Sequence, residues 1–235
     1  MPYTFVLVHG AWHGGWCWRR VADRLRGAGH AVFTPTLTGL GERAHLLRAG
    51  IGLETHVADV VNVFKWEGLA DVVLCGHSYG GMIISGVAEE MGAALRAIVF
   101  LDAFVPRDGE AVQDLTGPAV REAAAAALAR GDLGVPPRPA EAFGVNPDDR
   151  AWVDRLCVPQ PIATFTDKIA LTGAVARVPR KAYVRAASYA NPGFDRAFAS
   201  VRSDPAWRSY EVACGHDVMV DAPERLCEIL LESAI

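Results

Sequence analysis

The chain has 235 residues, of which 51% are hydrophobic and 21% charged, and its formal net charge is −4 at pH 7. This length is typical of one core with an inserted segment rather than of two domains. The slight negative charge, and the lack of basic patches with interleaved aromatic residues, exclude an electrostatic basis for binding nucleic acid or an anionic membrane surface.

We expect neither a targeting segment nor a membrane span in this sequence. It enters an apolar run at "YTFVLVHG" without a preceding basic stretch, and no run reaches the roughly 18 apolar residues of a transmembrane helix. We therefore expect a cytoplasmic protein with no membrane partner. The five cysteines lack the spacing of a disulfide framework or a zinc site, so we expect packing roles for most of them: Cys17, Cys75, Cys157, Cys214 and Cys227.

Short apolar runs alternate with longer segments of helical periodicity. Helical spacing runs from Trp18 to Leu25, where "GAGH" ends it, and recurs in 54–67, 80–91 and 222–233. Strands that are almost wholly apolar and separated by helices are typical of a parallel sheet covered on both faces. The pattern predicts a doubly wound α/β fold with a mostly parallel sheet. The runs assigned to strands are 4–8, 31–34, 72–75, 97–101, 182–187 and 208–213.

The alternation breaks between about 105 and 180. This stretch holds an alanine-rich helical segment (119–130), a proline-rich loop (134–149) and a further helical piece, "DRAWVDRLCV". A helical insertion at this point commonly covers the carboxyl ends of the strands, where ligands bind in open α/β sheets. We therefore expect an α/β core made of 1–104 and 181–235, with a helical cap from 105 to 180.

The segment "DVVLCGHSYGGMIIS" places Ser78 between a strand run and a helical segment, in the pattern Gly-x-Ser-x-Gly from Gly76 to Gly80. A sharp strand-to-helix turn presses the residues two before and two after the serine against neighbouring backbone, which glycine tolerates. The turn would present the Ser78 hydroxyl at the N-terminus of a helix, where developing negative charge is favoured. We expect Ser78 to be a nucleophile; the alternative is an incidental serine in a glycine-rich turn.

A serine nucleophile needs a base within hydrogen-bond reach. Of the seven histidines, His216 lies in the loop between the last strand run and the last helical segment, at the same sheet edge as Ser78. His77 immediately precedes the serine and should point away from it. We predict that His216 is the base, and that His30, His45 and His56 have structural or solvent-exposed roles.

Acyl transfer also needs donors that stabilise the oxyanion. One donor is predicted to be the backbone N–H of Tyr79, the residue after the nucleophile. The second is expected from the loop after the first strand run, "HGAWHGGWCW", where the Ala11 N–H is our candidate. Trp12 follows at once and is placed to form a wall of the pocket. Phe143 and Trp152 are further candidates to face the substrate, with packing inside the cap as the alternative.

With these parts assigned, the sequence resembles the α/β-hydrolase superfamily, and in particular the branch of plant methylesterases, hydroxynitrile lyases and their bacterial esterase relatives. The segments that carry the resemblance are "FVLVHGAWHGGWCW", "GAGHAVFTPTLTGLGER", "VVLCGHSYGGM" and "GHDVMVDAPERL". The resemblance covers nearly the whole chain and implies a serine hydrolase without a cofactor. The lyases use a threonine in the first loop and a lysine after the histidine, but this chain has Gly10 or Ala11, and Asp217, at those places.

The acid of the triad departs from the pattern that the resemblance implies. In the family it usually follows the next-to-last strand, where this sequence has Ser188 or Tyr189. Asp195 is the first acid beyond that strand, and Asp217 would have to fold back on its own backbone. Asp102 instead ends the earlier strand run "AIVFL", so we predict that Asp102 orients His216. The alternative is that Asp102 caps the turn that follows.

The resemblance implies carboxylic esters as the substrate class, and the apolar, aromatic first loop favours a small, uncharged, aromatic or methyl ester. We therefore predict an enzyme that cleaves such an ester through an acyl-enzyme. No HExxH, CxxC or paired-carboxylate spacing is present, so we expect no metal, and the resemblance implies that no cofactor is needed. Carbamate and amide hydrolases with the same triad are alternatives, as is a non-catalytic receptor of the same fold that binds a small ligand. The leaving group and the oligomeric state, including a homodimer, stay open.

Overall fold

A computed structural model of the chain describes residues 1–235. Its centre is a sheet of six parallel strands in the order β2-β1-β3-β4-β7-β8. The apolar runs of the sequence form the central strands because both of their faces are buried. The strands are β1 (Thr4–Val8), β2 (Ala31–Phe33), β3 (Val72–His77), β4 (Leu95–Leu101), β7 (Lys181–Ala186) and β8 (Trp207–Val212).

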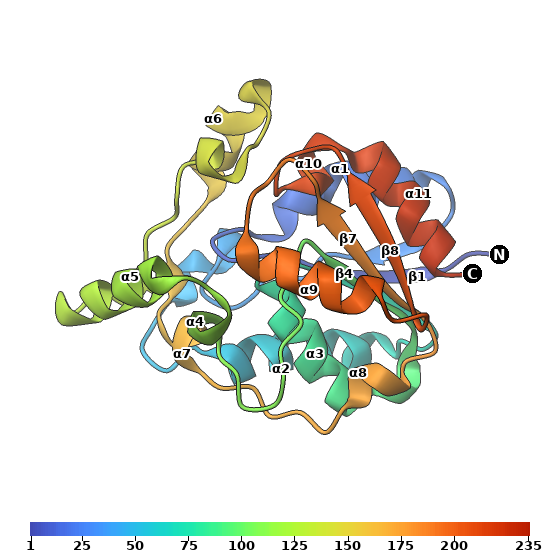
Figure 1. Cartoon of the computed structure of the whole chain (residues 1–235), viewed down its shortest axis with the longest axis horizontal. Coiled ribbons are helices and arrows are strands. Elements are labelled where there is room, and N and C mark those ends of the chain that lie inside the picture. The colour runs from blue at the N-terminus through green and yellow to red at the C-terminus, as the bar shows by residue number, and fades with distance from the viewer.

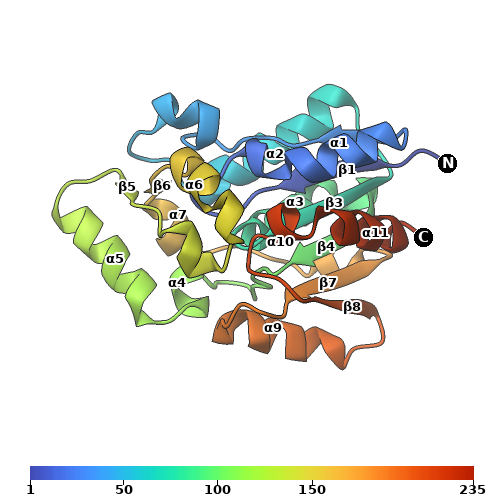
Figure 2. The same ribbon diagram turned by 90° about the horizontal axis from the view of Figure 1, so that it is seen from above.

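Helices cover both faces of this sheet (Figures 1 and 2). One face carries α2 (Leu53–Glu67), α3 (Gly80–Met91) and α9 (Pro192–Arg202), and the other α1 (Arg19–Gly27), α10 (Val218–Asp221) and α11 (Pro223–Ser233). Alternate residues of each strand enter the two apolar clusters; Val6 packs on the α2–α3 side and Leu7 on the α1–α11 side. The doubly wound α/β fold that the sequence predicts is confirmed.

The segment between β4 and β7 holds the short elements that sequence patterns miss. Most of it, including α4, α5, α6 and α7, lies on the side toward which β7 and β8 point (Figure 1). Its last part, which includes α8, instead packs against α3. The helices and strands of this segment are α4 (Val112–Leu115), α5 (Pro118–Ala129), β5 (Gly134–Val135), α6 (Pro147–Leu156), β6 (Gln160–Pro161), α7 (Ala163–Thr166) and α8 (Ala174–Arg177). The 3-10 helices of the whole chain are η1 (Gly15–Trp18), η2 (Gly41–Leu46), η3 (Gly92–Ala94) and η4 (Ala140–Phe143).

The expected helices correspond to observed ones within a few residues: α2 at 54–67, α3 at 80–91 and α5 at 119–130. The proline-rich loop is more ordered than expected, since it contains β5, η4 and the start of α6. The exact division into a core and a 105–180 cap stays a prediction. None of the helices has the length and apolar composition needed to cross a membrane.

Candidate active site

Ser78 occupies a sharp turn between β3 and α3. Its φ of +55° is in the left-handed region, which non-glycine residues rarely adopt. A Cβ on Gly76 would lie 2.5 Å from the Gly80 carbonyl oxygen, and a Cβ on Gly80 would lie 2.9 Å from the Val8 oxygen, so only glycine fits at either position. The Ser78 N–H donates to the Leu101 carbonyl at 3.1 Å, which ties the turn to the end of β4.

Asp102 and His216 form a short polar contact at the site. The Nδ1–H of His216 donates to Oδ2 of Asp102 at 2.6 Å, and both side chains are buried. Asp102 follows the last residue of β4 with a φ of +41°, and its own N–H donates to the Val184 carbonyl on β7 at 2.6 Å. With Nδ1 protonated toward the carboxylate, Nε2 is the nitrogen of His216 left to accept a proton.

Aromatic rings fix the plane of the His216 imidazole. Tyr189 and Phe194 stack on it, with ring centres 4.6 and 5.2 Å away and interplanar angles of 27° and 15°. The backbone N–H of His216 donates to the Phe143 carbonyl at 2.8 Å, which fixes the loop that carries the imidazole ring. Ser78 and His216 line the same cavity but form no hydrogen bond in this structure, as is common for catalytic pairs before substrate binds.

The two predicted oxyanion donors are available. Neither the Ala11 N–H nor the Tyr79 N–H donates a hydrogen bond within the chain, and both residues line the cavity beside Ser78. The next amide of the first loop is engaged, because the Trp12 N–H donates to Oε1 of Gln160 at 2.9 Å. Two residues with free amides therefore line the same cavity as Ser78.

The cavity that contains Ser78 and His216 is small, about 80 Å³. Aromatic rings dominate its walls, and Trp12 and Phe143 are among them as expected. Two polar side chains on its lining have unused donors: the Arg138 guanidinium, 5.5 Å from the Phe143 ring centre, and Nδ2 of Asn191, whose Oδ1 already accepts from Gly193 and Phe194. The full lining is Ala11, Trp12, Ser78, Tyr79, Phe104, Val112, Thr116, Val120, Arg138, Phe143, Phe165, Tyr189, Asn191, Phe194 and His216.

The structure does not bring Trp152 to this cavity, which corrects the expectation from sequence. Its ring packs edge-on against Trp16, with ring centres 5.1 Å apart, and the Arg20 guanidinium lies 5.5 Å from its centre. On α6 the face toward the interior is that of Val153, which is fully buried. Because adjacent helix positions point about 100° apart, Trp152 is directed along the outer side of η1 instead.

Sequence reasoning missed many of the residues that line the cavity. Phe104 lies two residues beyond Asp102, and Tyr189, Asn191 and Phe194 follow β7, so their place at the carboxyl edge of the sheet could have been inferred. Val112, Thr116, Val120, Arg138 and Phe165 come from short cap elements without a sequence motif.

A second buried histidine–aspartate pair lies behind the site. Nε2 of His13 is 3.0 Å from Oδ2 of Asp217, while Nδ1 donates to the Ala11 carbonyl at 2.7 Å. Burial opposes a charge on either group, but their mutual attraction outweighs it: the pKa of His13 is raised well above its ordinary value and that of Asp217 is lowered. Asp217 therefore pairs with His13, while Nε2 of His77 donates to the His216 carbonyl at 3.0 Å.

Comparison with known proteins identifies the family. The model of the alpha/beta hydrolase family matches residues 5–229, almost the full length of this chain. The chain belongs to the alpha/beta hydrolase family.

Among relatives in this family, a carbendazim hydrolyzing esterase from Nocardioides sp. is 46% identical over 97% of this chain and 98% of its own length. Methylesterase 7 of Arabidopsis thaliana is 36% identical over 43% of this chain and 40% of its own. An extracellular alpha/beta-hydrolase from a Paenibacillus species superposes with a TM-score of 0.87 at 25% identity, covering 99% of both chains. The resemblance seen in the sequence is thereby confirmed.

Proposed function

We propose that this chain is a serine hydrolase that cleaves a carbamate or carboxylic ester attached to a small aromatic group. The observation that carries the proposal is that one cavity contains Ser78, the Asp102-paired His216 and two free amides. This combination supplies a nucleophile, an oriented base and oxyanion donors.

In the proposed reaction, His216 Nε2 removes the Ser78 hydroxyl proton as Oγ attacks the carbonyl carbon. The resulting oxyanion accepts hydrogen bonds from the Ala11 and Tyr79 N–H groups. Collapse of the tetrahedral intermediate breaks the bond to the leaving group, to which His216 returns the proton. A water molecule, deprotonated by His216, then attacks the acyl or carbamoyl carbon, and the second tetrahedral intermediate collapses as His216 returns this proton to Oγ of Ser78. Asp102 keeps Nδ1 protonated throughout and stabilises the imidazolium.

The cavity walls support a planar, largely apolar substrate. Trp12, Phe143 and Phe165 form one group of rings, with ring centres 5.8 and 5.9 Å from that of Trp12. Offset or tilted rings at such distances leave faces and edges for a further aromatic ring. Arg138 and Asn191 offer donors but no anionic acceptor, which favours substrates that carry hydrogen-bond acceptors.

The choice between carbamate and carboxylic ester rests on the relative. The sequence alone favours a carboxylic ester, with a carbamate as the alternative. The esterase that is 46% identical acts on carbendazim, a carbamate, so the carbamate gains weight. Both substrates pass through a tetrahedral intermediate that the same donors stabilise, and we therefore propose that the chain accepts both classes.

The experiment is a panel of aryl carbamates, aryl and methyl esters, and amides with matched aromatic groups. We expect turnover of carbamates and esters, with an initial burst of leaving group near one equivalent per chain wherever release of the intermediate is slow. Anilides of the same acids should react far more slowly. Ligands that raise the melting temperature without any turnover across the panel would contradict the proposal and favour a receptor.

A further inference from the structure

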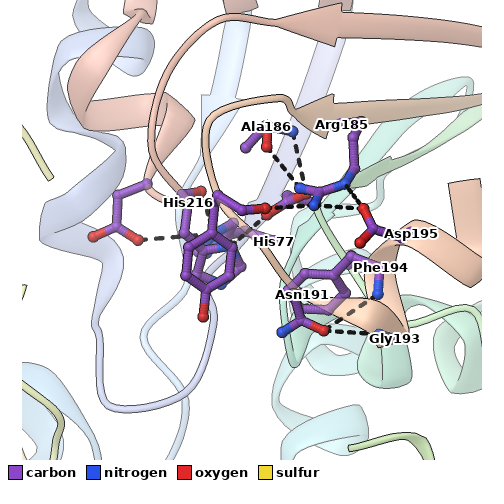
Figure 3. Close-up of polar contacts among 12 residues, drawn as sticks. His77, Arg185, Ala186, Asn191, Gly193, Phe194, Asp195 and His216 are labelled. Carbon is purple, nitrogen blue, oxygen red and sulfur yellow. Dashed lines mark hydrogen bonds and ion pairs between the residues drawn. The ribbon is translucent and has the colours of Figure 1, made fainter. Parts of the chain in front are cut away.

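Arg185, on β7, has every N–H of its guanidinium engaged inside the protein (Figure 3). Nη1 donates to Oδ1 of Asp102 and to the Ala186 carbonyl, both at 2.6 Å. Nε and Nη2 donate to Oδ1 of Asp195 at 3.0 and 2.8 Å, and Nη2 also donates to the Tyr189 carbonyl. Because all five donors are engaged, the side chain is held in one orientation.

The other oxygen of Asp102 is the one that holds His216. Oδ2 accepts from Nδ1 of His216, while Oδ1 accepts from Arg185 and, at 3.1 Å, from the Ala186 N–H. The Asp102 side chain has no exposed surface. A carboxylate at such a depth takes up a proton unless a positive charge and hydrogen bonds compensate for its lost hydration.

We propose that Arg185 is a positioning residue for the reaction: it keeps Asp102 ionised and directs its second oxygen at Nδ1 of His216. This inference rests on the proposed function of the site. Arg185 touches no reacting atom and does not line the cavity. Its effect reaches the substrate through the hydrogen bond between Asp102 and His216.

The Arg185 guanidinium keeps its positive charge. Burial disfavours its charge, but attraction to Asp102 and hydrogen bonds to Asp195 and Asp102 outweigh this, and the pKa of Arg185 is raised from its ordinary value. Asp195, on α9, is 61% exposed, so it offsets the Arg185 charge only partly. A net positive field therefore acts on Asp102 and, through it, on His216.

Several buried ionisable groups around the pair have shifted pKa values, and that of His13 is raised well above its ordinary value because burial is outweighed by attraction to Asp217. On the side of β3 and the last loop, burial lowers the pKa of His77, and the charge of His13 lowers that of Asp217 despite burial. On the side of β7 and β8, burial raises the pKa of Tyr183, and that of Cys214 to about 12. The acid limb of kcat/KM should therefore report the Asp102–His216 pair.

Removing the Arg185 charge should raise the proton affinity of this pair. We expect Arg185→Met to move the acid limb of kcat/KM up by about one pH unit or more, the size of effect that an adjacent arginine has on a carboxyl group. Asp195→Asn should have the opposite sign, a shift to lower pH of less than about half a unit, because it removes an exposed and screened charge. Arg185→Lys keeps the positive charge but loses the planar set of guanidinium donors. The acid limb of its kcat/KM profile should therefore stay near that of wild type, while kcat/KM falls roughly 10-fold.

The experiment measures kcat/KM from pH 5 to 9 for these variants and for Asp102→Asn, with thermal melts as a check on folding. Arg96→Met is the matched control, since Arg96 also pairs with an aspartate but lies near the other end of β4. A folded Arg185→Met with an unmoved limb would overturn the inference. If that variant does not fold, Arg185→Lys with full activity, or Asp195→Asn with its limb moved upward, would overturn it. Full activity of Asp102→Asn would instead refute the proposed triad.

Discussion

Strained backbone gathers at individual residues of the site. Only four non-glycine residues have positive φ, and three of them, Trp12, Ser78 and Asp102, lie at the site. Each conformation costs on the order of 1–3 kcal/mol and persists because the surroundings fix it. Two hydrogen bonds fix the backbone of Trp12: its N–H donates to the Gln160 side chain, and the Val158 N–H donates to its carbonyl at 2.9 Å.

The role proposed for Asp102 predicts the effect of one substitution. Asparagine preserves the shape but favours the wrong histidine tautomer, and the same exchange in a serine-protease triad costs about 10⁴-fold in rate. We expect Asp102→Asn to lower kcat at least roughly 100-fold at pH 8 with little change in melting temperature. Steady-state kinetics and thermal melts provide the check.

Asp195→Asn is the control, and it should retain kcat within about 3-fold at pH 8, because it removes an exposed and screened charge that does not line the cavity. If Asp195→Asn lost kcat and Asp102→Asn kept it, the acid of the triad would be Asp195, after β7, rather than Asp102, after β4.

The sequence predicts the residues that obey local rules and misses those that depend on tertiary contacts. Gly76 to Gly80 specify a turn by sterics, so Ser78 and the Tyr79 amide follow from the chain alone. Asp102 follows from its place at the end of a buried strand. Arg185 has no such signal, because its role depends on the contact with Asp102 at the end of the neighbouring strand, which the sequence does not show.

At the scale of elements, the short strands β5 and β6 connect the cap to the first loop of the core. The Trp12 indole N–H donates to the Val135 carbonyl at 3.0 Å, and the Trp12 backbone N–H donates to Gln160. Two-residue strands have too little pattern to be predicted, and the face that α6 presents to the interior depends on what packs against it. For this reason Phe143 lines the cavity as expected from the sequence, whereas Trp152 does not.

Phe143→Ala should change the preference among aromatic substrates, because its ring lines the cavity and packs against Trp12. We expect the ratio of kcat/KM values between a large and a small aryl carbamate to change several-fold, since a lost wall ring is worth about 1–2 kcal/mol of binding. Competition assays with pairs of substrates measure this ratio directly.

Trp152→Ala is the matched control for that experiment. It should leave the ratio unchanged while lowering the free energy of unfolding by about 1–2 kcal/mol, through lost packing against Trp16 and Arg20. A changed preference in Trp152→Ala but not in Phe143→Ala would show that the cap is arranged differently around the substrate.

The His13–Asp217 pair joins two loops of the site and predicts a dependence of stability on pH. Because the pKa of His13 is raised on folding, its contribution is complete below the unfolded value and is lost as pH rises through the folded value. The lowered pKa of Asp217 adds stability above about pH 4, which is lost as pH falls.

We expect Asp217→Asn to lower the free energy of unfolding by about 3 kcal/mol at pH 6, because it leaves a buried imidazolium unpaired. The difference from wild type should shrink toward pH 10 as His13 loses its proton. Urea unfolding at several pH values tests this, and a difference that grows with pH would contradict the assignment of charges.

At the scale of the whole molecule, the fold is the part that sequence predicts best. Six apolar runs became six parallel strands because a strand buried on both faces leaves the same pattern wherever it occurs. Because all six strands are parallel, the loops of the candidate site also lie together at the carboxyl ends of the strands. The cap lacks that constraint, since its short elements bury only part of their surface.

The chain contains no group of three or more histidine, cysteine or acidic side chains that could hold a metal ion. A mechanism that uses only Ser78, His216 and Asp102 needs none, so incubation with a chelator should leave kcat unchanged within error. A loss of rate that zinc restores would contradict this mechanism.

The most direct test of the proposed mechanism is the value of kcat/KM for Ser78→Ala with an aryl carbamate and the matching ester. Because the proposed route makes and breaks a bond to Oγ, we predict a loss of at least about 10⁴-fold on both substrates, with an unchanged melting temperature. A folded Ser78→Ala protein that keeps more than about a tenth of the wild-type kcat/KM would contradict the claim that Ser78 is the nucleophile.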